Sequence, residues 1–291
     1  MQQSFPKVEG VTHRFVTVNG LNWHLAEAGS GEPILMLHGW PQHWYMWRYQ
    51  IPHLAQQYAV ICPDMRGFGW SDAPVTGYEK EKLVDDVIAL LDTLEIKRIR
   101  LMAHDWGGWV AFLLCLRQPE RIQCYLALNI PHPFQTLDSR TIQLWRFWYQ
   151  WVIASPFLGK WIIQHQSGLV KQLLQWGVVN KTWSDDEIVA YTSRLQEPAR
   201  AYASVQLYRS FLLREFIPII FGRYRSSHLS TPTLIFFGTR DFALAPELLK
   251  GYEPYADNLK IELVPNCGHF IAEDLPELVI KRALEFFDGM P

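Results

Sequence analysis

The segment 101–112, LMAHDWGGWVAF, places a carboxylate at the tip of a very sharp turn. An apolar run ends at His104 and Asp105, two glycines follow almost at once, and an apolar helical pattern then resumes. This order predicts a strand, a tight turn and a helix. Because the N-terminus of a helix favours negative charge, we expect Asp105 to be ionised where open α/β sheets bind their ligands. An aspartate that only caps the helix is the alternative interpretation.

Asp105 and two later side chains form a candidate catalytic set. Small residues flank Asp105, as in a nucleophile elbow, the strained strand-to-helix turn that presents a reactive side chain. Asp241 ends a late apolar run in FFGTRD, and His269 follows a glycine in NCGHF, where it could activate water. A sharp turn in LHGWP could aim the backbone N–H of Trp40 at the elbow, where the N–H of Trp106 would complete an oxyanion hole. The order nucleophile, acid, histidine is that of the α/β-hydrolases.

Eight strand-like runs alternate with helical patterns along the chain, and these elements must position the candidate residues. The first two flank Asn19-Gly20, which is typical of a β-hairpin, and the middle ones are continuously apolar, like strands buried on both faces. The runs cover residues 13–18, 21–29, 33–39, 58–65, 99–105, 123–130, 231–241 and 260–269. Helices are predicted over residues 44–57, 80–94, 107–118, 246–255 and 274–287. The alternation predicts an α/β fold with a mostly parallel central sheet of about eight strands flanked by helices.

About one hundred residues interrupt this alternation. The segment 131–230 is rich in Trp, Tyr and Gln and has a mainly helical pattern, with a capped helix start in SDDE at 184–187. We expect this segment to be a helical cap, or lid, over the ligand-binding edge of the sheet. The α/β core would then consist of residues 1–130 and 231–291.

The composition indicates a globular protein without a strongly charged partner. The 27 Lys and Arg residues nearly balance 29 Asp and Glu residues, which argues against a nucleic-acid or membrane partner. The four cysteines are scattered and mostly lie in apolar runs, so we expect buried free thiols and a cytoplasmic protein. We expect neither a secretory signal nor a membrane span, because the apolar stretches are too short or too broken. Zinc spacings, phosphate-binding loops and dinucleotide fingerprints do not occur.

Taken together, the motifs resemble those of the epoxide hydrolase and haloalkane dehalogenase group of α/β-hydrolases, and most of all those of epoxide hydrolases. The resemblance covers nearly the whole chain, through HGWP, DMRGFGWSD at 64–72, HDWGG, GTRDFALAPE and GHF. It implies that Asp105 is the nucleophile, that His269 is the general base and that Asp241 orients His269. A carboxylate suits attack on an epoxide carbon, because the resulting ester can be hydrolysed whereas the ether formed by a serine could not. The expected product is a vicinal diol, and no metal or organic cofactor is expected.

The resemblance also implies that two tyrosines of the cap hold the epoxide oxygen and supply its proton. Tyr149 in RFWYQW and Tyr208 in VQLYRS match the contexts of these tyrosines, while Tyr191 and Tyr202 are nearby alternatives. An unperturbed phenol, with a pKa of about 10, can donate a proton during ring opening. The residues expected to line the substrate pocket are Trp40, Pro41, Trp106 and Phe270. The aromatic-rich cap favours a small apolar or aryl epoxide, and the protein could be a monomer or a homodimer.

Haloalkane dehalogenase is the main alternative activity, because it would use the same nucleophile, acid and histidine. Such an enzyme holds the departing halide with side-chain N–H groups; relatives of this kind often have Asn in place of Trp40, although the Trp106 indole could still donate. A fluoroacetate-type enzyme would need a cation after the nucleophile, where this chain has Trp106. Asp105 argues against a serine esterase. A non-catalytic binding protein with this fold is the remaining alternative, and we would expect it to lose members of the triad.

Other polar residues are expected to support the structure. Asp64 ends a strand and is interpreted as organising the next turn, where glycines permit tight backbone geometry. We expect His104 to make hydrogen bonds next to the nucleophile, and His38 and His132 to fix loops. The acidic cluster of Glu79, Glu81, Asp85 and Asp86 is interpreted as a solvated helix face.

Overall fold

An eight-stranded sheet forms the centre of the molecule. The computed structural model describes residues 5–135, 144–165 and 168–290, and within them the strand order is β1-β2-β4-β3-β5-β6-β7-β8. The strands are β1 (Thr12–Val18), β2 (Leu21–Ala28), β3 (Glu32–Leu37), β4 (Tyr58–Pro63), β5 (Ile99–His104), β6 (Ile122–Leu128), β7 (Thr233–Gly238) and β8 (Leu259–Val264). β2 pairs antiparallel with β1 and β4, and the other neighbours pair in parallel. The predicted, mostly parallel sheet of an α/β fold is therefore confirmed.

The positions of the strands follow from the apolar runs. β5, β6 and β7 carry buried side chains at nearly every position, as expected of strands that are covered on both faces. The β1–β2 hairpin turns at Asn19 and Gly20, whose φ angles of 50° and 78° suit these two residue types. The hairpin prediction is confirmed.

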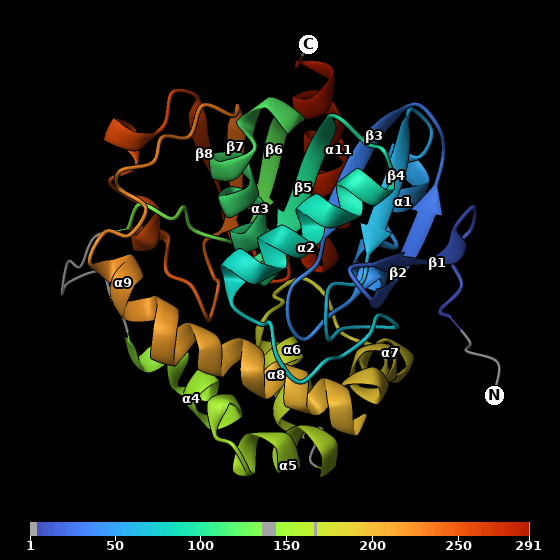
Figure 1. The fold of residues 1–291 in the computed structure, drawn as a ribbon, viewed down its shortest axis with the longest axis vertical. Coiled ribbons are helices and arrows are strands. Elements are labelled where there is room, and N and C mark those ends of the chain that lie inside the picture. The colour runs from blue at the N-terminus through green and yellow to red at the C-terminus, as the bar shows by residue number, and fades with distance from the viewer. Residues whose placement is uncertain (1–4, 136–143, 166–167, 291) are drawn as a thin grey trace.

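Helices cover both faces of the sheet. α2 (Lys80–Thr93) and α3 (Asp105–Arg117) lie on one face, and α1 (Ile51–Leu54) and α11 (Pro276–Asp288) lie on the other, as Figure 1 shows. α10 (Ile271–Asp274) immediately precedes α11. Because α3 begins directly after β5 ends at His104, its first residue lies at the carboxyl edge of the sheet.

Two of the predicted helices are wrong, and a proline or a glycine interrupts the pattern in each. The segment 44–57 forms a 3₁₀ turn, Trp44–Trp47, and the short α1, because Pro52 has no N–H to continue the preceding turn. The segment 246–255 forms two 3₁₀ turns that are separated by Gly251, which has a φ of 83°. The other predicted helices, at 80–94, 107–118 and 274–287, are present as α2, α3 and α11.

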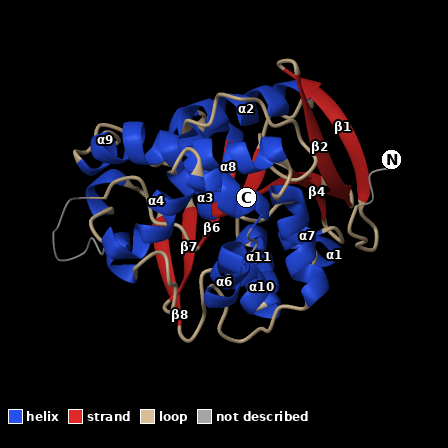
Figure 2. Ribbon diagram, turned by 90° about the horizontal axis from the view of Figure 1, so that it is seen from below, coloured by secondary structure: helices blue, strands red, loops and turns tan. Residues whose placement is uncertain are grey.

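Six helices of the described residues gather beyond the carboxyl edge of the sheet, and we call them the cap helices. They are α4 (Trp148–Ala154), α5 (Leu158–His165), α6 (Gly168–Trp176), α7 (Asp185–Leu195), α8 (Pro198–Ser210) and α9 (Phe216–Ile220), with a π-helix, Phe211–Glu215, between α8 and α9. Figure 1 shows them together at the lower end of the molecule, and Figure 2 views the molecule from that end. The capping box predicted at Ser184 is present at the start of α7. Within the described ranges, every helix is too short or too polar to cross a membrane.

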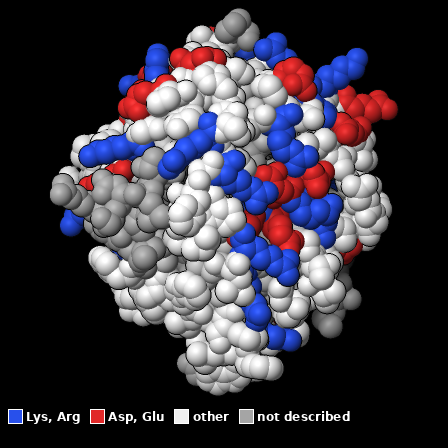
Figure 3. All heavy atoms as spheres, turned by 60° about the vertical axis from the view of Figure 1, so that its left-hand side comes forward, with Lys and Arg blue, Asp and Glu red and all other residues white. Residues whose placement is uncertain are grey.

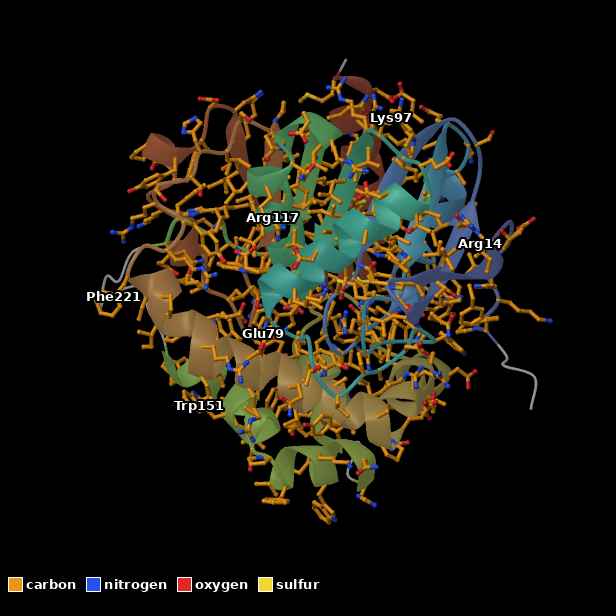
Figure 4. The ribbon with its side chains drawn as sticks, viewed as in Figure 1. Arg14, Glu79, Lys97, Arg117, Trp151 and Phe221 are labelled. Atoms are coloured by element: carbon orange, nitrogen blue, oxygen red, sulfur yellow. The ribbon has the colours of Figure 1, made fainter. Side chains whose placement is uncertain are left out.

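The outer surface of the cap helices is largely apolar. Figure 3 shows charged side chains of both signs over the middle and upper parts of the molecule and fewer at its lower end, which the cap helices form. Trp148, Trp151, Phe157 and Trp161 are exposed there, and Figure 4 shows Trp151 pointing outward. Such a patch is typical of a surface that meets another molecule, so the homodimer stays a prediction beside the monomer.

Buried polar residues fix the loops at the carboxyl edge. Asp64 accepts hydrogen bonds from two backbone N–H groups, at 2.9 Å each, and pairs with His24 at 2.7 Å. His38 accepts a hydrogen bond from the N–H of Met65 at 3.0 Å, and His132 accepts one from the N–H two residues further on. The interpretation of these residues as loop organisers is confirmed. The predicted buried free thiols are also found, at Cys62, Cys115, Cys124 and Cys267.

The acidic residues of α2 are only partly a solvated face. Glu81 and Asp85 pair with the exposed Arg117, as expected of such a face. Asp86, however, is buried and pairs with Arg66 at 2.5 and 2.8 Å. Its interpretation as a solvated residue is wrong, because the buried guanidinium group of Arg66 requires a counter-ion.

Two buried ion pairs join the cap helices to the core. Lys80 at the start of α2 is fully buried, and its ammonium group lies 3.1 Å from Glu215 at the end of the π-helix. Arg48 contacts Glu273 of α10 and Glu187 of α7, at 2.5 Å each. Removing one partner of such a pair leaves a buried charge uncompensated, so these contacts fix the cap helices over the edge of the sheet.

We expect the protein to lose stability as the pH falls from about 6.5 to about 4.5. Burial lowers the pKa of His43, His104 and His132 to about 4. These side chains stay neutral in the folded state, while the unfolded chain takes up protons below a pKa of about 6.5. Each can therefore reduce the free energy of unfolding by up to about 1.4 kcal/mol per pH unit in this window. Urea unfolding curves across the window measure the slope.

A substitution at one of these histidines tests the cause of the slope. His43→Gln should flatten it, because glutamine is neutral in both the folded and the unfolded state. His165→Gln, at an exposed position on α5, is the matched control and should leave the slope unchanged. A wild-type free energy of unfolding that stays constant over the window would contradict the prediction.

Candidate active site

Asp105 lies at a strained strand-to-helix turn between β5 and α3. Its φ angle is 50°, a left-handed conformation that costs energy for a residue with a side chain. Small neighbours make the turn possible: a Cβ atom on Gly39 would lie 2.4 Å from the Asp105 side chain, and one on Gly107 would lie 2.3 Å from the carbonyl oxygen of His38. The strand, tight turn and helix predicted around Asp105 are therefore present.

The two carboxylate oxygens of Asp105 have different surroundings. Oδ1 accepts a hydrogen bond from the backbone N–H of Trp40 at 2.9 Å, and the carboxylate also accepts one from the backbone N–H of Trp106. Oδ2 lies 3.6 Å from Nε2 of His269. Burial opposes ionisation, but the hydrogen bond and the charge of His269, aided by the backbone donor, hold the pKa of Asp105 below its usual value. Asp105 is an anion with one oxygen held by the backbone and the other facing an imidazole.

Asp241 orients the ring of His269 through a hydrogen bond of 2.7 Å between Oδ2 and Nδ1. The Asp241 carboxylate is itself fixed by the backbone N–H groups of Ala243 and Leu244, at 2.7 and 2.9 Å, and by the side-chain amide of Asn129 at 2.9 Å. Asn129 is absent from the sequence-based site. Its place directly after β6, at the same edge of the sheet, is the signal that could have found it.

Two carboxylates favour the charged form of His269. Burial lowers its pKa, but the charge of Asp241 and the hydrogen bonds to Asp105 and Asp241 raise the pKa to about 10. The resting site is therefore an ion pair of the His269 imidazolium and the Asp105 carboxylate. His104 lies beside it with a pKa lowered to about 4 by burial, and its Nε2 donates to the backbone carbonyl of His269 at 2.9 Å. As expected, His104 positions its neighbour without carrying charge.

Two buried phenols of the cap helices lie next to this ion pair. Tyr149 of α4 lines the same cavity as Asp105, and the ring of Tyr208 of α8 packs edge-on against it, with centroids 6.1 Å apart. A hydrogen bond links the two tyrosines, and the Trp106 side chain donates another to Tyr208. Burial and the negative charge of Asp105 raise the pKa of both tyrosines above its usual value. The site therefore holds two neutral phenols beside an anionic carboxylate.

An apolar cavity lies between Asp105 and the cap helices. Its apolar lining includes Ile130, Phe147, Phe211, Phe216, Ile219 and Leu248. Trp106 lines this cavity as predicted, whereas Trp40, Pro41 and Phe270 do not. The wall of this cavity therefore lacks three of the four predicted residues, whose contact with substrate stays a prediction, and the packing around two of them explains their absence from it.

Trp40 and Phe270 pack behind the reactive side chains. The Trp40 indole N–H donates to Ser204 of α8 at 3.0 Å, and the ring packs edge-on against Tyr208. Phe270 packs edge-on against His269 and lies so close to Gly177 that a Cβ atom there would come within 2.3 Å of the ring. Both aromatic residues support the site from behind and are not available to a ligand in the cavity.

The two alternative tyrosines lie elsewhere. Tyr191 donates a hydrogen bond to Glu273 at 2.6 Å, within the ion-pair cluster around Arg48. Tyr202 lines an outer groove between α8 and the segment before α2. Neither contributes to the wall of the cavity at Asp105. Tyr149 does line this cavity, and Tyr208, which does not, is joined to its wall by hydrogen bonds with Tyr149 and the Trp106 side chain.

The arrangement is suited to nucleophilic and acid–base chemistry. Asp105 can attack an electrophilic carbon, the phenols can protonate an oxygen that leaves it, and the imidazole can activate water. In the part of the chain that the structure describes, no three His, Cys, Asp or Glu side chains are grouped to hold a metal ion.

Comparisons with known proteins find similarity along nearly the whole chain. Residues 32–276 match the family described as alpha/beta hydrolase fold. A soluble epoxide hydrolase of Corynebacterium sp. (strain C12) is 30% identical over 287 residues, which cover 95% of this chain and 97% of that protein. The ligand-free epoxide hydrolase CorEH has a TM-score of 0.83 and 27% identity, over 96% of this chain and 99% of its own. A putative acyltransferase from Salmonella enterica has a TM-score of 0.89 and 26% identity, over 100% and 99% of the two chains.

Proposed function

The chain belongs to the α/β hydrolase fold family, and we propose that it hydrolyses an epoxide to a vicinal diol. Relatives named epoxide hydrolase, which align with most of the chain, support this activity. The observation that carries the proposal is the ionised Asp105 beside the neutral phenol of Tyr149 at an apolar cavity, with the neutral phenol of Tyr208 packed against Tyr149. A carboxylate can displace at a saturated carbon, and a neutral phenol can protonate the oxygen that leaves.

We also propose that residues 1–130 and 231–291 form the α/β core and that residues 131–230 form the cap. β7 and β8 follow the cap helices in the chain and pair next to β6, which supports this division. The cap then supplies the phenols, and the core supplies the carboxylate and the imidazole.

In the first step, Oδ2 of Asp105 attacks one ring carbon and the C–O bond of the epoxide breaks. Oδ2 is the attacking atom because Oδ1 is engaged by the N–H of Trp40. Tyr149 and Tyr208 bind the epoxide oxygen, and one of them transfers its proton as the alkoxide forms. The product is a hydroxyalkyl ester on Asp105 together with one phenolate.

The loss of the negative charge of Asp105 on formation of the ester turns His269 into a base. Esterification removes the negative charge of Asp105 and its hydrogen bond, which are two of the causes that raise the pKa of His269. The imidazolium then releases its proton, and the phenolate can take it up. Neutral His269, still oriented by Asp241, is ready to remove a proton from water.

In the second step, the activated water attacks the carbonyl carbon of Asp105. Negative charge develops on Oδ1, which the N–H groups of Trp40 and Trp106 stabilise as an oxyanion hole. The bond between the acyl carbon and Oδ2 then breaks, the leaving alkoxide takes up the proton of the added hydroxyl group, and the diol leaves with Oδ2 as one of its hydroxyl oxygens while His269 stays protonated. Asp105 is regenerated with one oxygen from water.

The N–H donors of the site give less support to haloalkane dehalogenase activity. A halide needs free side-chain donors, but the Trp40 indole bonds to Ser204 at 3.0 Å and the Trp106 side chain bonds to Tyr208. Acyl transfer, which the name of one similar structure suggests, ordinarily needs a serine where this elbow has Asp105. A purely binding role is disfavoured because the acid, the imidazole and the nucleophile all face one another.

Styrene oxide and chlorobutane, supplied in parallel, test the proposed activity. We expect diol from styrene oxide and no chloride from chlorobutane. Tyr208→Phe should lower kcat for styrene oxide by about 10²- to 10⁴-fold, which is the usual contribution of a general acid. The measurements are diol formation by chromatography and chloride release in solution.

Tyr202→Phe is the matched control, because Tyr202 lies on the same helix but lines the outer groove. It should leave kcat unchanged. Chloride release that outpaces diol formation would assign dehalogenase activity instead, and wild-type turnover by Tyr208→Phe would remove the phenol from the mechanism.

A further inference from the structure

Three buried polar atoms of residues that line the cavity have no hydrogen-bond partner among the described residues. They are Nε1 of Trp109, Nε2 of Gln135 and Oε1 of Gln150. All three residues line the cavity that contains Asp105, and they come from α3, from the segment after β6 and from α4. Buried polar atoms in native proteins are nearly always paired, so three unpaired atoms around one cavity call for a ligand that pairs them.

Gln150 and Trp109 offer an acceptor and a donor at separate points of the wall. Each side chain is only 5% exposed. Nε2 of Gln150 donates to the Tyr149 hydroxyl at 3.4 Å, and rotating the amide would merely leave its nitrogen unpaired in place of its oxygen. Trp109 lies one turn beyond Asp105 on α3, about 6 Å along the helix axis, and its indole N–H can only donate. A group that reaches the Trp109 N–H therefore belongs to a part of the substrate beyond the reacting ring.

The other residues that line the cavity favour an uncharged substrate group next to Trp109 and Gln150. Apart from Asp105, no Asp, Glu, Lys or Arg side chain lines the cavity within the described ranges. Lys80 contacts the Trp106 ring, with its ammonium group 4.6 Å from the centroid, but it is paired with Glu215. A charged substituent would lose its hydration in the cavity without gaining a counter-ion.

We propose that Trp109, Gln135 and Gln150 form a polar subsite that binds a carboxamide-like group of the epoxide substrate. This inference rests on the proposed epoxide hydrolase function. The carbonyl oxygen of the group accepts hydrogen bonds from the N–H groups of Trp109 and Gln135, and its N–H donates to Gln150. The expected substrate class thereby narrows from apolar or aryl epoxides to aryl epoxides with a neutral substituent that both accepts and donates hydrogen bonds.

A matched pair of substrates tests the subsite. The para-carboxamide and para-isopropyl derivatives of styrene oxide have similar shape, but only the first can form hydrogen bonds. We expect kcat/KM of the wild type to favour the carboxamide by about tenfold or more. Gln150→Met and Trp109→Phe should each lower the ratio of the two kcat/KM values by about tenfold, since each removes one hydrogen-bonding atom. The ratio is the measurement because Gln150 also contacts Tyr149, so that both substrates lose rate in that variant.

Two matched controls leave the cavity untouched. The first control is Gln206→Met, at a residue that lines the outer groove along α8. The second is Trp151→Phe, at a residue on the outward face of α4 in Figure 4. Neither should change the ratio. Equal ratios in the wild type and the cavity variants would overturn the subsite and leave its polar atoms to water.

Binding of unreactive ligands separates the subsite from the proposed function. Benzamide should bind the wild-type protein about tenfold more tightly than isopropylbenzene, measured by the quenching of tryptophan fluorescence. Equal affinity of the two ligands would contradict the subsite. If benzamide binds preferentially but neither epoxide is hydrolysed, the subsite stands and the proposed function fails.

Discussion

Asp105→Asn should reduce kcat for epoxide hydrolysis by about four orders of magnitude or more, because a neutral amide cannot attack the ring carbon. The amide has the shape of the carboxylate, and its oxygen can still accept the hydrogen bond that the N–H of Trp40 donates to Oδ1. The elbow should therefore keep its structure. Steady-state diol formation measures the loss, and circular dichroism and urea unfolding verify that the variant is folded.

Heavy-oxygen water distinguishes the ester mechanism from direct attack of water. In a single turnover with excess wild-type protein, the first diol should carry an oxygen from Asp105 and none from the labelled solvent, because Oδ2 stays on the substrate carbon. Asp85→Asn, at a half-exposed position on α2, is the matched control and should leave kcat unchanged. Two results would remove Asp105 from its role as nucleophile: label in the first diol, or wild-type turnover by an Asp105→Asn variant that mass spectrometry shows to be free of deamidation.

The residues that the α/β core contributes to the site could be predicted, because their positions depend on local sequence patterns and on one rule of sheet topology. An apolar run followed by small residues determines the turn at Asp105, and similar runs precede Asp241 and His269. Parallel strands that are connected through helices direct their carboxyl ends to one edge. Residues far apart in the chain, at the ends of β5, β7 and β8, are thereby brought together without any knowledge of their side-chain contacts.

The tyrosines that the cap helices contribute to the site could not be derived from the sequence in the same way. Tyr149, Tyr191 and Tyr208 all lie on helices and are all buried, so periodicity does not separate a tyrosine that meets the substrate from one that packs. How the helices lie over the sheet decides between them, and that depends on ion pairs such as Lys80–Glu215, which join residues far apart in sequence. The resemblance to epoxide hydrolases indicated Tyr149, which lines the cavity, and Tyr208, which packs against it, because the family pattern reflects the three-dimensional arrangement.

The differences between the predicted and the observed pocket wall also depend on contacts between residues that are far apart in sequence. A tryptophan beside the expected oxyanion hole suggests a pocket wall, but the Trp40 indole is directed to Ser204 on α8. The polar subsite was missed because unpaired atoms are visible only after every other hydrogen bond has been assigned. Gln150 has no sequence feature that distinguishes it from other glutamines of the cap.

In the proposed mechanism, the resting ion pair couples the two chemical steps. Charge on Asp105 makes it a nucleophile, adds to the effect of burial that raises the pKa of both phenols, and adds to the effect of Asp241 that keeps His269 charged. Alkylation of Asp105 removes that charge, which lowers the pKa of His269 and frees it to act as a base. The same carboxylate that performs the first step therefore holds back the second until the ester has formed.

His269→Gln should permit the first step and block the second. Glutamine cannot remove a proton from water, so the ester on Asp105 should accumulate to about one equivalent, and steady-state turnover should fall by about 10²- to 10⁴-fold. Intact-protein mass spectrometry after mixing with styrene oxide measures the adduct. Peptide mapping should place it on the segment that contains Asp105. His228→Gln, at an exposed position, is the matched control and should turn over without any adduct.

The pH dependence of ester decay links the trapped adduct to the charge of His269. In the wild type, decay should accelerate with rising pH until the imidazole is fully neutral, because only the neutral form removes a proton from water. The resting pKa of about 10, which the charge of Asp241 and the contacts with Asp105 sustain together, should not limit this rise, since the contribution of Asp105 is lost in the ester. The apparent pKa of decay should therefore lie below the resting value, and His269→Gln should lack the titration. An adduct that never forms, or one that decays in the variant with the wild-type pH profile, would assign water activation to another group.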